Sequence, residues 1–313
     1  MIAVQISSYG GKEALTINKK AARPKLSRGQ ILVEVGAAAL NPVDNAIMSG
    51  YMKDIVPLSF PITLGGDFSG VVVEVGEGVT NFRIDDKVYG QAIVLNGGSG
   101  TLAQFVAANA ANTAKMPKLM NFVEAASLPL AGVSALQAIE ENINLKADQK
   151  ILIHGGAGGI GSIAIQMAKN LGAYVAVTVS TDDKPYVKKL GADKVIDYTK
   201  EAFEEILTDY DAVLCLVGGE TINKSFKVLR KDGVLVSLVG LPEPELAGKY
   251  HVTAIRQLTA TSTGNLNRLT ELVDTGKIKV HVAKVFQLNQ ALEAFTYLTE
   301  GHPKGKVVVR IND

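Results

Sequence analysis

A glycine-rich segment in the middle of the chain is the strongest chemical signal in the sequence. It fits the pattern G-x-G-x-x-G and reads Gly156-Ala157-Gly158-Gly159-Ile160-Gly161. The segment follows an apolar run and precedes apolar residues at helical spacing, which is the strand-turn-helix context that the pattern requires. We expect Gly156 to allow the tight turn, Gly158 to admit a pyrophosphate to the main chain, and Gly161 to let the helix pack closely. The free N–H groups at the start of that helix would bind the phosphates, so the segment predicts a dinucleotide site.

The residues after the next expected strand bear on which dinucleotide binds. The strand at 174–179 ends without an acidic residue, Ser180 follows it, and Lys184 comes four residues later. An NAD site places a carboxylate here for the ribose hydroxyls, and that carboxylate would repel the 2′-phosphate of NADP. Ser180 can donate a hydrogen bond and Lys184 can supply positive charge. Asp182 and Asp183 weaken this case unless they cap the following helix. We predict NADPH as the cofactor.

The chain changes its pattern near residue 120. Before that point, short apolar runs such as 31–35 and 70–76 are bounded by Gly and Pro turns and predict a mainly β domain. From residue 122, apolar runs alternate with segments of helical spacing, which is typical of a doubly wound parallel sheet of the Rossmann type. The expected parallel strands are residues 150–154, 174–179, 194–196, 211–217, 233–239 and 257–262.

The composition of the 313 residues fits a folded protein without a general affinity for nucleic acid. Hydrophobic residues make up 47%, and 32 basic against 31 acidic residues give a net charge of +1. That balance provides no overall case for binding nucleic acid. The basic run at 19–28 has no interleaved aromatic residue to stack on bases, and we interpret it as a solvated loop.

The cysteine and histidine content gives no metal site. Cys215, the single cysteine, excludes a disulfide framework and a Cys-rich zinc lobe, and its apolar surroundings predict a buried side chain. No histidine is spaced with other ligands as a metal set, and His154 is expected to be structural. No apolar run reaches the roughly 18 residues of a membrane span. The first residues lack the regions of a signal peptide, so we expect a cytoplasmic protein that does not enter a membrane.

Several further motifs occur in a fixed order over nearly the whole chain. Beside the glycine-rich segment they are Asn41-Pro42-Val43-Asp44, Gly65-Gly66-Asp67-Phe68-Ser69-Gly70, Leu128-Pro129-Leu130-Ala131-Gly132, Leu190-Gly191-Ala192-Asp193 and Gly305-Lys306-Val307-Val308-Val309. In these motifs the sequence resembles the medium-chain dehydrogenase/reductase superfamily, and within it the zinc-free quinone oxidoreductase branch.

The resemblance implies a split fold. A mainly β catalytic domain resembling chaperonin-10 would be built from residues 1–121 and 263–313, and the Rossmann domain at 122–262 would be inserted into it. The resemblance also implies that Ser180, Lys184 and Tyr198 surround the adenosine 2′-phosphate, and that the protein is a homodimer. Gly240 and Leu241, after the fifth strand, would lie beside the nicotinamide, and residues 242–245 would form a mobile loop.

The resemblance also bears on the chemistry. Where the alcohol dehydrogenase branch holds a catalytic zinc, this sequence has Asn41, Gly66-Asp67 and the apolar stretch around Leu130, which cannot supply three zinc ligands. Without a strong Lewis acid, hydride from NADPH goes more readily to an acceptor that is already electron-poor. A quinone or an α,β-unsaturated carbonyl meets that condition, because conjugation carries the incoming charge to oxygen.

Two side chains are candidates for catalytic roles. Asn41 could hydrogen-bond near the nicotinamide or the substrate, or simply form the turn before Pro42. Tyr51 is the candidate proton donor, against the reading that it only lines the cleft or the surface, and Asp44 is expected to brace the turn. The alternative function is a non-catalytic NADPH-binding protein, structural, sensory or RNA-associated.

Overall fold

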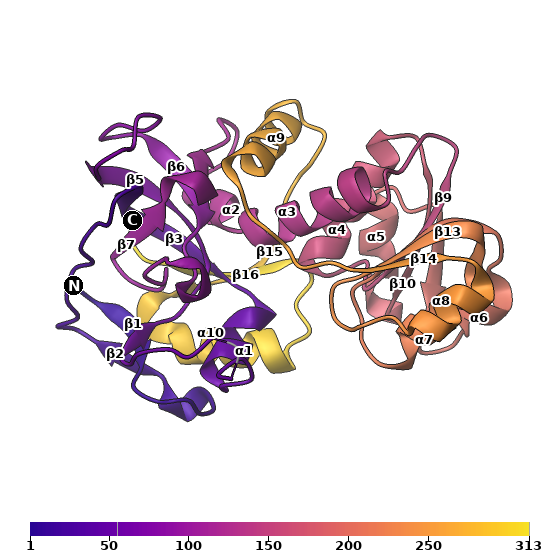
Figure 1. Ribbon diagram of the computed structural model, residues 1–313, viewed down its shortest axis with the longest axis horizontal. Helices are drawn as coiled ribbons and strands as arrows, with labels where there is room; N and C mark the ends of the chain where they lie inside the picture. The colour runs from indigo at the N-terminus through magenta and orange to yellow at the C-terminus, as the bar shows by residue number, and fades with distance from the viewer. Residues whose placement is uncertain (55, 313) are drawn as a thin grey trace. The chain divides into compact units, whose positions relative to one another are not determined.

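The structure is a computed structural model that describes residues 1–54 and 56–312. The chain folds into two compact units. Unit 1 comprises Met1–Leu130, Thr261–Thr275 and Val280–Asp313, and unit 2 comprises Ala131–Ala260 and Gly276–Lys279. Both chain termini lie in unit 1 (Figure 1). The middle of the chain is therefore an insertion into a unit that the two ends build together.

Unit 1 is built around a mixed sheet with the strand order β15-β16-β3-β5-β6-β8, in which β7 also pairs with β3. Its strands are β3 (Gln30–Leu40), β5 (Asp67–Val75), β6 (Lys87–Gln91), β7 (Phe105–Asn109), β8 (Thr113–Lys115), β15 (Val282–Gln287) and β16 (Lys306–Arg310). A small sheet joins β1 (Ala3–Ile6), β2 (Thr16–Asn18) and β4 (Ile62–Thr63). The C-terminal strand β16 pairs antiparallel with β3, with Val307 opposite Leu40. This pairing brings the last residues of the chain to the end of β3.

Helices cover this sheet at its ends and on its faces. They are α1 (Pro42–Met48), α2 (Phe122–Ala126), α9 (Thr263–Asp274) and α10 (Ala291–Glu300), while α3 (Pro129–Leu136) begins in unit 1 and continues in unit 2. Short 3₁₀ helices are η1 (Lys12–Ala14), η2 (Val94–Asn96), η3 (Ala110–Asn112) and η7 (Leu288–Gln290). Helix α2 packs on β3 and β5, and the Ser69 hydroxyl donates to the Phe122 carbonyl at 2.6 Å. Residues 122–130 therefore belong with the β-rich unit, although the sequence pattern grouped them with the Rossmann segment.

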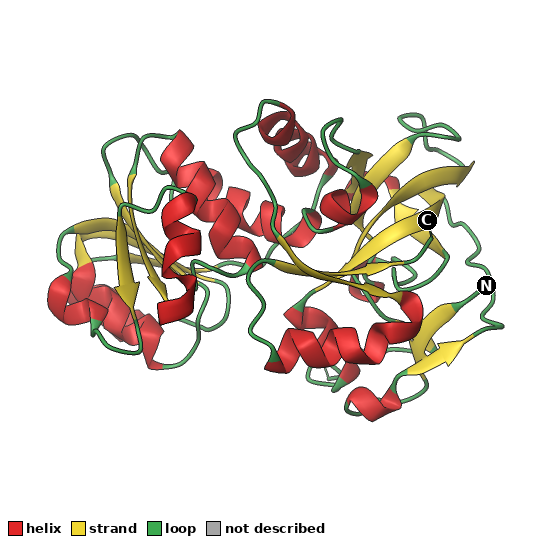
Figure 2. Ribbon diagram, turned by 180° about the vertical axis from the view of Figure 1, so that it is seen from behind, coloured by secondary structure: helices red, strands yellow, loops and turns green. Residues whose placement is uncertain are grey.

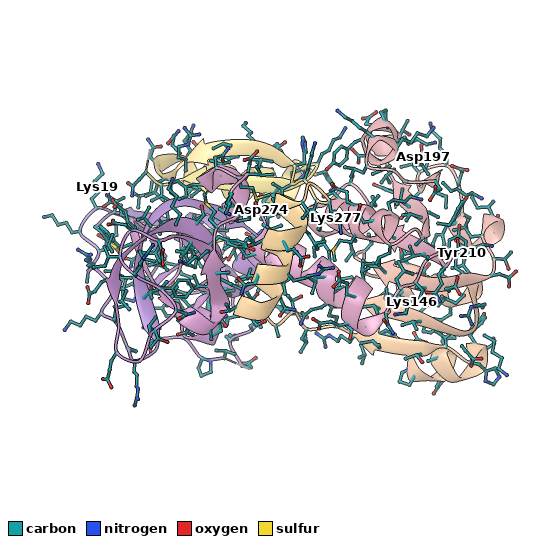
Figure 3. All side chains as sticks on the ribbon, turned by 90° about the horizontal axis from the view of Figure 1, so that it is seen from above. Lys19, Lys146, Asp197, Tyr210, Asp274 and Lys277 are labelled. Carbon is teal, nitrogen blue, oxygen red and sulfur yellow. The ribbon has the colours of Figure 1, made fainter. Side chains whose placement is uncertain are left out.

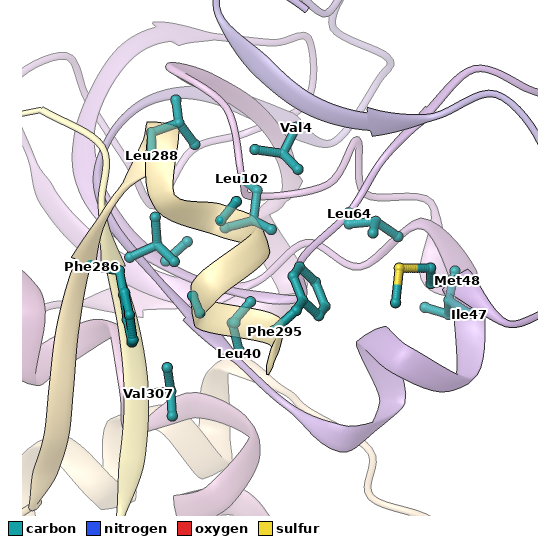
Figure 4. Close-up of a cluster of buried hydrophobic side chains, with 14 of the residues drawn as sticks. Val4, Leu40, Ile47, Met48, Leu64, Leu102, Phe286, Leu288, Phe295 and Val307 are labelled. Carbon is teal, nitrogen blue, oxygen red and sulfur yellow. The ribbon is translucent and has the colours of Figure 1, made fainter. Parts of the chain in front are cut away.

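A core of unit 1 lies where α10 packs against the strands (Figure 4). Phe295 of α10 is 1% exposed and sits among Leu40 of β3, Val307 of β16 and Leu102. Full burial of an aliphatic or aromatic side chain stabilises a fold by roughly 1.5–3 kcal/mol. The C-terminal helix and strand are thus held to the first part of the chain by their apolar faces.

Unit 2 is a parallel sheet of six strands in the order β11-β10-β9-β12-β13-β14. The strands are β9 (Lys150–His154), β10 (Tyr174–Val179), β11 (Lys194–Asp197), β12 (Tyr210–Cys215), β13 (Leu229–Ser237) and β14 (Thr253–Arg256). The helices are α4 (Gly159–Asn170), α5 (Lys184–Lys189), α6 (Phe203–Ile206), α7 (Glu220–Ser225) and α8 (Pro244–Tyr250), with the π-helix η4 (Gln137–Asn142) and the 3₁₀ helices η5 (Thr181–Asp183) and η6 (Phe226–Val228). Figure 2 shows helices on both faces of these strands. The predicted Rossmann sheet inserted into a mainly β domain is confirmed.

The strand order of unit 2 reverses at β9. The chain runs outward from β9 through β10 to β11, then returns to the other side of β9 with β12. In open α/β sheets, the crevice beyond the carboxyl ends of the strands at such a reversal is where ligands bind. The turn after β9 is therefore placed where a nucleotide site is expected.

Two sequence predictions in unit 2 are wrong. The sixth strand is Thr253–Arg256 rather than 257–262, since β14 pairs with β13 in the register Val234 to Thr253. As an edge strand it is only partly buried and carries no apolar run that the sequence could reveal. The expected loop at 242–245 is also shorter, because Pro244 opens helix α8, where its fixed φ suits the first turn.

Within residues 1–54 and 56–312, no helix combines the length and the apolar character needed to cross a membrane.

The core of unit 1 leads to a stability prediction for two positions on α10. Phe295→Ala should lower the free energy of unfolding by about 3–5 kcal/mol, because it opens a cavity among fully buried side chains. Leu292→Ala, on the exposed side of the same helix, should change it by less than about 0.5 kcal/mol. Urea denaturation of the two variants checks this, and equal losses would contradict the assigned core.

Candidate functional site

The glycine-rich turn joins strand β9 to helix α4. Gly155 adopts the left-handed conformation with φ of +72°, and Gly158 caps the helix that Gly159 begins. The tight turn therefore depends on Gly155, the residue before the one expected from the motif. A Cβ on Gly156 would lie 3.0 Å from the Cβ of Val177, so Gly156 instead permits close approach to strand β10.

The other two motif glycines differ sharply in their surroundings. A Cβ on Gly161 would lie 2.3 Å from the Gly155 carbonyl oxygen and 2.8 Å from the Gly156 Cα, so the helix packs directly on the turn. A Cβ on Gly158 would meet only the Gly155 oxygen, at an ordinary 3.5 Å. No protein atom described in unit 2 requires glycine at 158, and a group lying against the main chain there would. This combination fits a pyrophosphate at the start of α4, whose first N–H groups have no partner within the helix.

His154 closes strand β9 beneath the turn and is 1% exposed. Its Nε2 lies 3.1 Å from the Ser225 hydroxyl, whose own hydrogen is donated to the Thr221 carbonyl at 2.6 Å. Nε2 must therefore carry the ring proton, and Nδ1 accepts from the Thr178 hydroxyl at 2.9 Å. Burial lowers the pKa of His154 to about 3, which keeps the ring neutral. These contacts give His154 the structural role expected from the sequence.

The three residues assigned to the 2′-phosphate lie beyond the carboxyl ends of two neighbouring strands. Ser180 follows β10, Tyr198 follows β11, and the Tyr198 N–H donates to the Val179 carbonyl at 3.2 Å. The Ser180 hydroxyl donates to Asp183 at 2.8 Å. The side chain of Lys184 is 34% exposed, and Tyr198 is 61% exposed. The structure thus brings these residues to one edge of the sheet, with Lys184 and Tyr198 open to solvent.

One acidic residue at this edge was given no role by the sequence analysis. Asp197 ends β11, is fully buried, and lies 3.9 Å from the Lys184 ammonium; Figure 3 locates it in unit 2. Hydrogen bonds from the hydroxyl groups of Thr181, at 2.5 Å, and Thr199, at 2.6 Å, lower the pKa of Asp197 to about 2. Because both of its oxygens accept these hydrogen bonds, Asp197 anchors the loops after β10 and β11.

The remaining expected residue pair of unit 2 follows strand β13. The Gly240 N–H donates to the Ser237 hydroxyl at 3.3 Å, and Leu241 is 68% exposed. Ser237 is the last residue of β13, so this turn lies beyond the same ends of the parallel strands as the glycine-rich turn. Its contact with the nicotinamide stays a prediction.

A cluster of buried polar side chains, which we call the Lys306 cluster, lies in unit 1. It consists of Asn41, Asp44, Asp67 and Lys306, each at most 6% exposed. Asn41 Nδ2 donates to Asp67 Oδ2 at 2.8 Å, and Asn41 Oδ1 accepts from the Lys306 ammonium. The ammonium also donates to the Leu40 carbonyl at 3.0 Å and lies 3.7 Å from Asp67 Oδ2.

The backbone completes the Lys306 cluster. The Leu130 N–H donates to Asp67 Oδ1 at 3.2 Å. The Asn41 N–H donates to Asp44 Oδ2 at 2.8 Å, so Asp44 braces the turn before α1, as the sequence suggested. Burial raises the pKa of Asp44 to about 7 and raises that of Asp67, while burial lowers the pKa of Lys306. Asp44 is therefore near its midpoint at neutral pH.

The positions that the resemblance aligned with zinc ligands do meet in space, around an ammonium group. Asn41 and Leu130 both bond to Asp67, whose Oδ2 also faces Lys306. An amide, an apolar residue and one carboxylate already paired with an ammonium do not fit a zinc ion. Across the described parts of the chain there is no group of three or more His, Cys, Asp or Glu that could hold a metal ion.

Two further residues considered in the sequence, Tyr51 and Cys215, lie in different environments in the structure. Tyr51 is 86% exposed at the end of the turn after α1, so unit 1 does not hold its phenol in place, and its role as proton donor stays a prediction. Cys215 is buried, donates to the Val217 carbonyl at 3.0 Å, and has its pKa raised by burial to about 11. Lys306 lies within the motif at residues 305–309, and no local pattern in the sequence marks its side chain as buried.

The glycine contacts lead to a prediction for the ligand-free protein. Gly161→Ala should lower the stability by about 2 kcal/mol or more, because the new methyl group overlaps backbone atoms of the turn. Gly158→Ala should cost less than about 1 kcal/mol, since its methyl group meets only an ordinary contact. Calorimetric melting without nucleotide compares the two, and a larger loss for Gly158→Ala would contradict this packing.

The raised pKa of Asp44 predicts how stability depends on pH. The unfolded chain releases this proton near pH 4, whereas the folded chain keeps it to about pH 7, so stability falls as pH rises between these values. The loss is about 4 kcal/mol for a shift of this size. Asp44→Asn should make that slope shallower, while Asp54→Asn at an exposed position should keep it. Urea midpoints at several pH values measure both, and an unchanged slope in Asp44→Asn would be the contrary result.

Comparison with known families and proteins agrees with this arrangement. Residues 27–118 match the family described as alcohol dehydrogenase GroES-like domain, and residues 190–309 match the family described as zinc-binding dehydrogenase. A 2-methylene-furan-3-one reductase of Solanum lycopersicum is 36% identical over 99% of this chain and 79% of its own length. An NADPH-dependent alkenal/one oxidoreductase of Arabidopsis thaliana is 35% identical over 97% of this chain and 78% of its own. A chloroplast envelope quinone oxidoreductase homolog of the same plant is 33% identical, over 99% and 98%.

Solved structures give the same result over the whole length. The quinone oxidoreductase of Coxiella burnetii superposes with a TM-score of 0.91 at 34% identity, covering 100% of this chain and 99% of that one. The Escherichia coli quinone oxidoreductase complexed with NADPH has a TM-score of 0.89 at 27% identity, covering 99% and 100%. The chain therefore belongs to the medium-chain dehydrogenase/reductase superfamily, in its quinone oxidoreductase branch.

Proposed function

We propose that this protein is a zinc-independent, NADPH-dependent oxidoreductase that reduces quinones or the activated C=C bond of α,β-unsaturated carbonyls. The observation that carries the proposal is the turn at the reversal of the parallel sheet, where Gly158 leaves room against the main chain at the start of α4. The branch to which the chain belongs supports the reaction class.

Different residues of unit 2 bind different parts of the cofactor. The turn at 156–161 and the start of α4 hold the pyrophosphate, where N–H groups and the helix dipole favour negative charge. Ser180, Lys184 and Tyr198 hold the adenosine 2′-phosphate, and Gly240 with Leu241 contacts the nicotinamide. Bound NADPH supplies the hydride. Asp197 is engaged by Thr181 and Thr199, so its carboxylate is not turned toward the 2′-phosphate at this edge.

The chemistry of unit 1 favours a conjugated acceptor. Where the alcohol dehydrogenase branch has zinc ligands, the Lys306 cluster has a neutral amide and an ion pair between Asp67 and Lys306. These residues therefore offer no Lewis acid to polarise an isolated carbonyl. A quinone or enone needs less help, because its own conjugation carries the negative charge to oxygen. The names of three relatives, a furanone reductase, an alkenal/one oxidoreductase and a quinone oxidoreductase homolog, share this type of acceptor.

The test of the function is turnover of NADPH by the purified protein. Loss of NADPH absorbance with benzoquinone-type and enone acceptors, and none with simple ketones, is the expected result, unchanged by a chelator. Tight NADPH binding without turnover of any acceptor in a broad panel of both classes would instead support the non-catalytic alternative.

The partners and location expected from the sequence remain proposals. The small-molecule acceptor needs no macromolecular partner, and we propose a homodimer, which light scattering would test. The cytoplasmic location is likewise a proposal, since the relatives include proteins named as chloroplastic and mitochondrial. Fluorescent tagging of the native protein would locate it.

The assignment of the 2′-phosphate leads to a specificity prediction. Lys184→Glu should raise KM for NADPH on the order of 10-fold or more and leave KM for NADH nearly unchanged, because only NADPH carries the added phosphate charge. Lys189→Glu, at an exposed position on the same helix, is the matched control and should affect neither. Equal changes for both cofactors in Lys184→Glu would place the phosphate elsewhere.

A further inference from the structure

The ammonium of Lys306 is buried among acceptor groups of the protein. Lys306 is 6% exposed and lies at the first position of β16. The ammonium donates to the Leu40 carbonyl and to the Asn41 side-chain oxygen, and Asp67 Oδ2 lies 3.7 Å from it. Its burial leaves little of the side chain for direct contact with a substrate. Any effect of Lys306 on chemistry must therefore pass through one of these partners.

The Asn41 amide is held in a single orientation by two partners of opposite charge. Its oxygen faces the ammonium of Lys306, and its nitrogen donates to the carboxylate of Asp67 at 2.8 Å. Turning the amide over would place its NH₂ against the ammonium and its oxygen against the carboxylate. Both contacts would then be repulsive in a buried environment, where such interactions are strong. The ion pair thus selects one of the two amide orientations.

Strand pairing brings Lys306 to this amide. Asn41 follows β3 directly, and Val307, next to Lys306, pairs with Leu40 at the end of β3. Asp67 is the first residue of β5, which pairs with the same strand opposite Ala39. Three strand ends therefore meet at Asn41, and the C-terminal strand contributes the only positive charge among the side chains of the cluster.

We propose that Lys306 is a positioning residue that fixes the Asn41 amide for its contact with the acceptor. The proposal rests on the proposed function, since it assigns Asn41 to the reacting groups. The competing explanation is purely structural: Lys306 only neutralises the buried carboxylate of Asp67. The two explanations differ once that carboxylate is removed, because a charge-balancing lysine is then dispensable and a positioning lysine is not.

The experiment compares two variants that share a neutral residue 67. Asp67→Asn keeps the contact between Lys306 and the Asn41 oxygen, and its kcat/KM for the acceptor is the reference rate for the comparison. Adding Lys306→Met to Asp67→Asn removes the donor without stranding a carboxylate. The added change should not lower stability, because it also removes a buried ammonium that has lost its carboxylate. It should lower kcat/KM on the order of 100-fold, the size expected for a misplaced reacting group.

Control measurements separate a positioning role of Lys306 from a loss of folding or of cofactor binding. The dissociation constant for NADPH should stay unchanged, because the cofactor residues lie in unit 2. Lys118→Met at an exposed position of unit 1 should change neither stability nor rate. Lys306→Gln with Asp67→Asn supplies a weaker, uncharged donor and should give an intermediate rate. If the Met variant does not fold, this Gln variant decides the question, and a rate equal to that of Asp67→Asn alone would overturn the proposal.

An independent readout covers the case in which the wild-type protein reduces no acceptor. The side-chain amide resonance of Asn41, assigned by its loss in Asn41→Ala, should shift between Asp67→Asn and the double variant with Lys306→Met. An unchanged resonance, or an unchanged kcat/KM, would show that Lys306 does not position the amide. An inactive wild type with a shifted resonance would refute the proposed function and leave the orientation of Asn41 by Lys306 supported.

Discussion

A buried ammonium group must be surrounded by acceptors, and in unit 1 that requirement joins distant parts of the chain. Lys306, near the C-terminus, finds its acceptors at the ends of β3 and β5 in the first 70 residues. Burying a charge without a partner costs several kcal/mol, so β16 has one favourable position on the sheet. The apolar core around Phe295 reinforces the same pairing. The middle of the chain is consequently free to fold as a separate unit inserted between these ends.

The two units solve different physical problems. Unit 2 needs room for a ligand beside the main chain, and free N–H groups, at the reversal of a parallel sheet. Glycines provide both, because Gly161 packs directly against the backbone of Gly155 and leaves no room for a side chain. His154 and Asp197 support this edge as fully hydrogen-bonded buried groups. Unit 1 instead needs fixed polar side chains in a dry environment, and it obtains them through mutual neutralisation of Asp67 and Lys306. Backbone geometry dominates the first case, and electrostatics dominates the second.

Reduction of a conjugated acceptor by NADPH is consistent with the features of both units. A nucleotide-binding turn whose neighbouring carboxylate is already engaged suits NADPH, and a polar cluster that does not fit a metal ion suits an acceptor that is activated by its own conjugation. The family relationship agrees with both. The proposed role of Lys306 adds that, at the positions aligned with a metal site, an ammonium group orients the Asn41 amide.

The sequence by itself determined the Rossmann sheet, its glycine-rich turn and the family, because these depend on local periodicity and on residues close together in the chain. It placed β14 wrongly, since an edge strand has no continuous apolar run, and it named Gly156 where Gly155 makes the turn. Only the tertiary structure revealed Asp197 as a buried anchor and Lys306 as the partner of Asn41 and Asp67. Those roles arise from contacts between strands far apart in sequence. No local pattern in the 313 residues shows which lysine side chain will be buried.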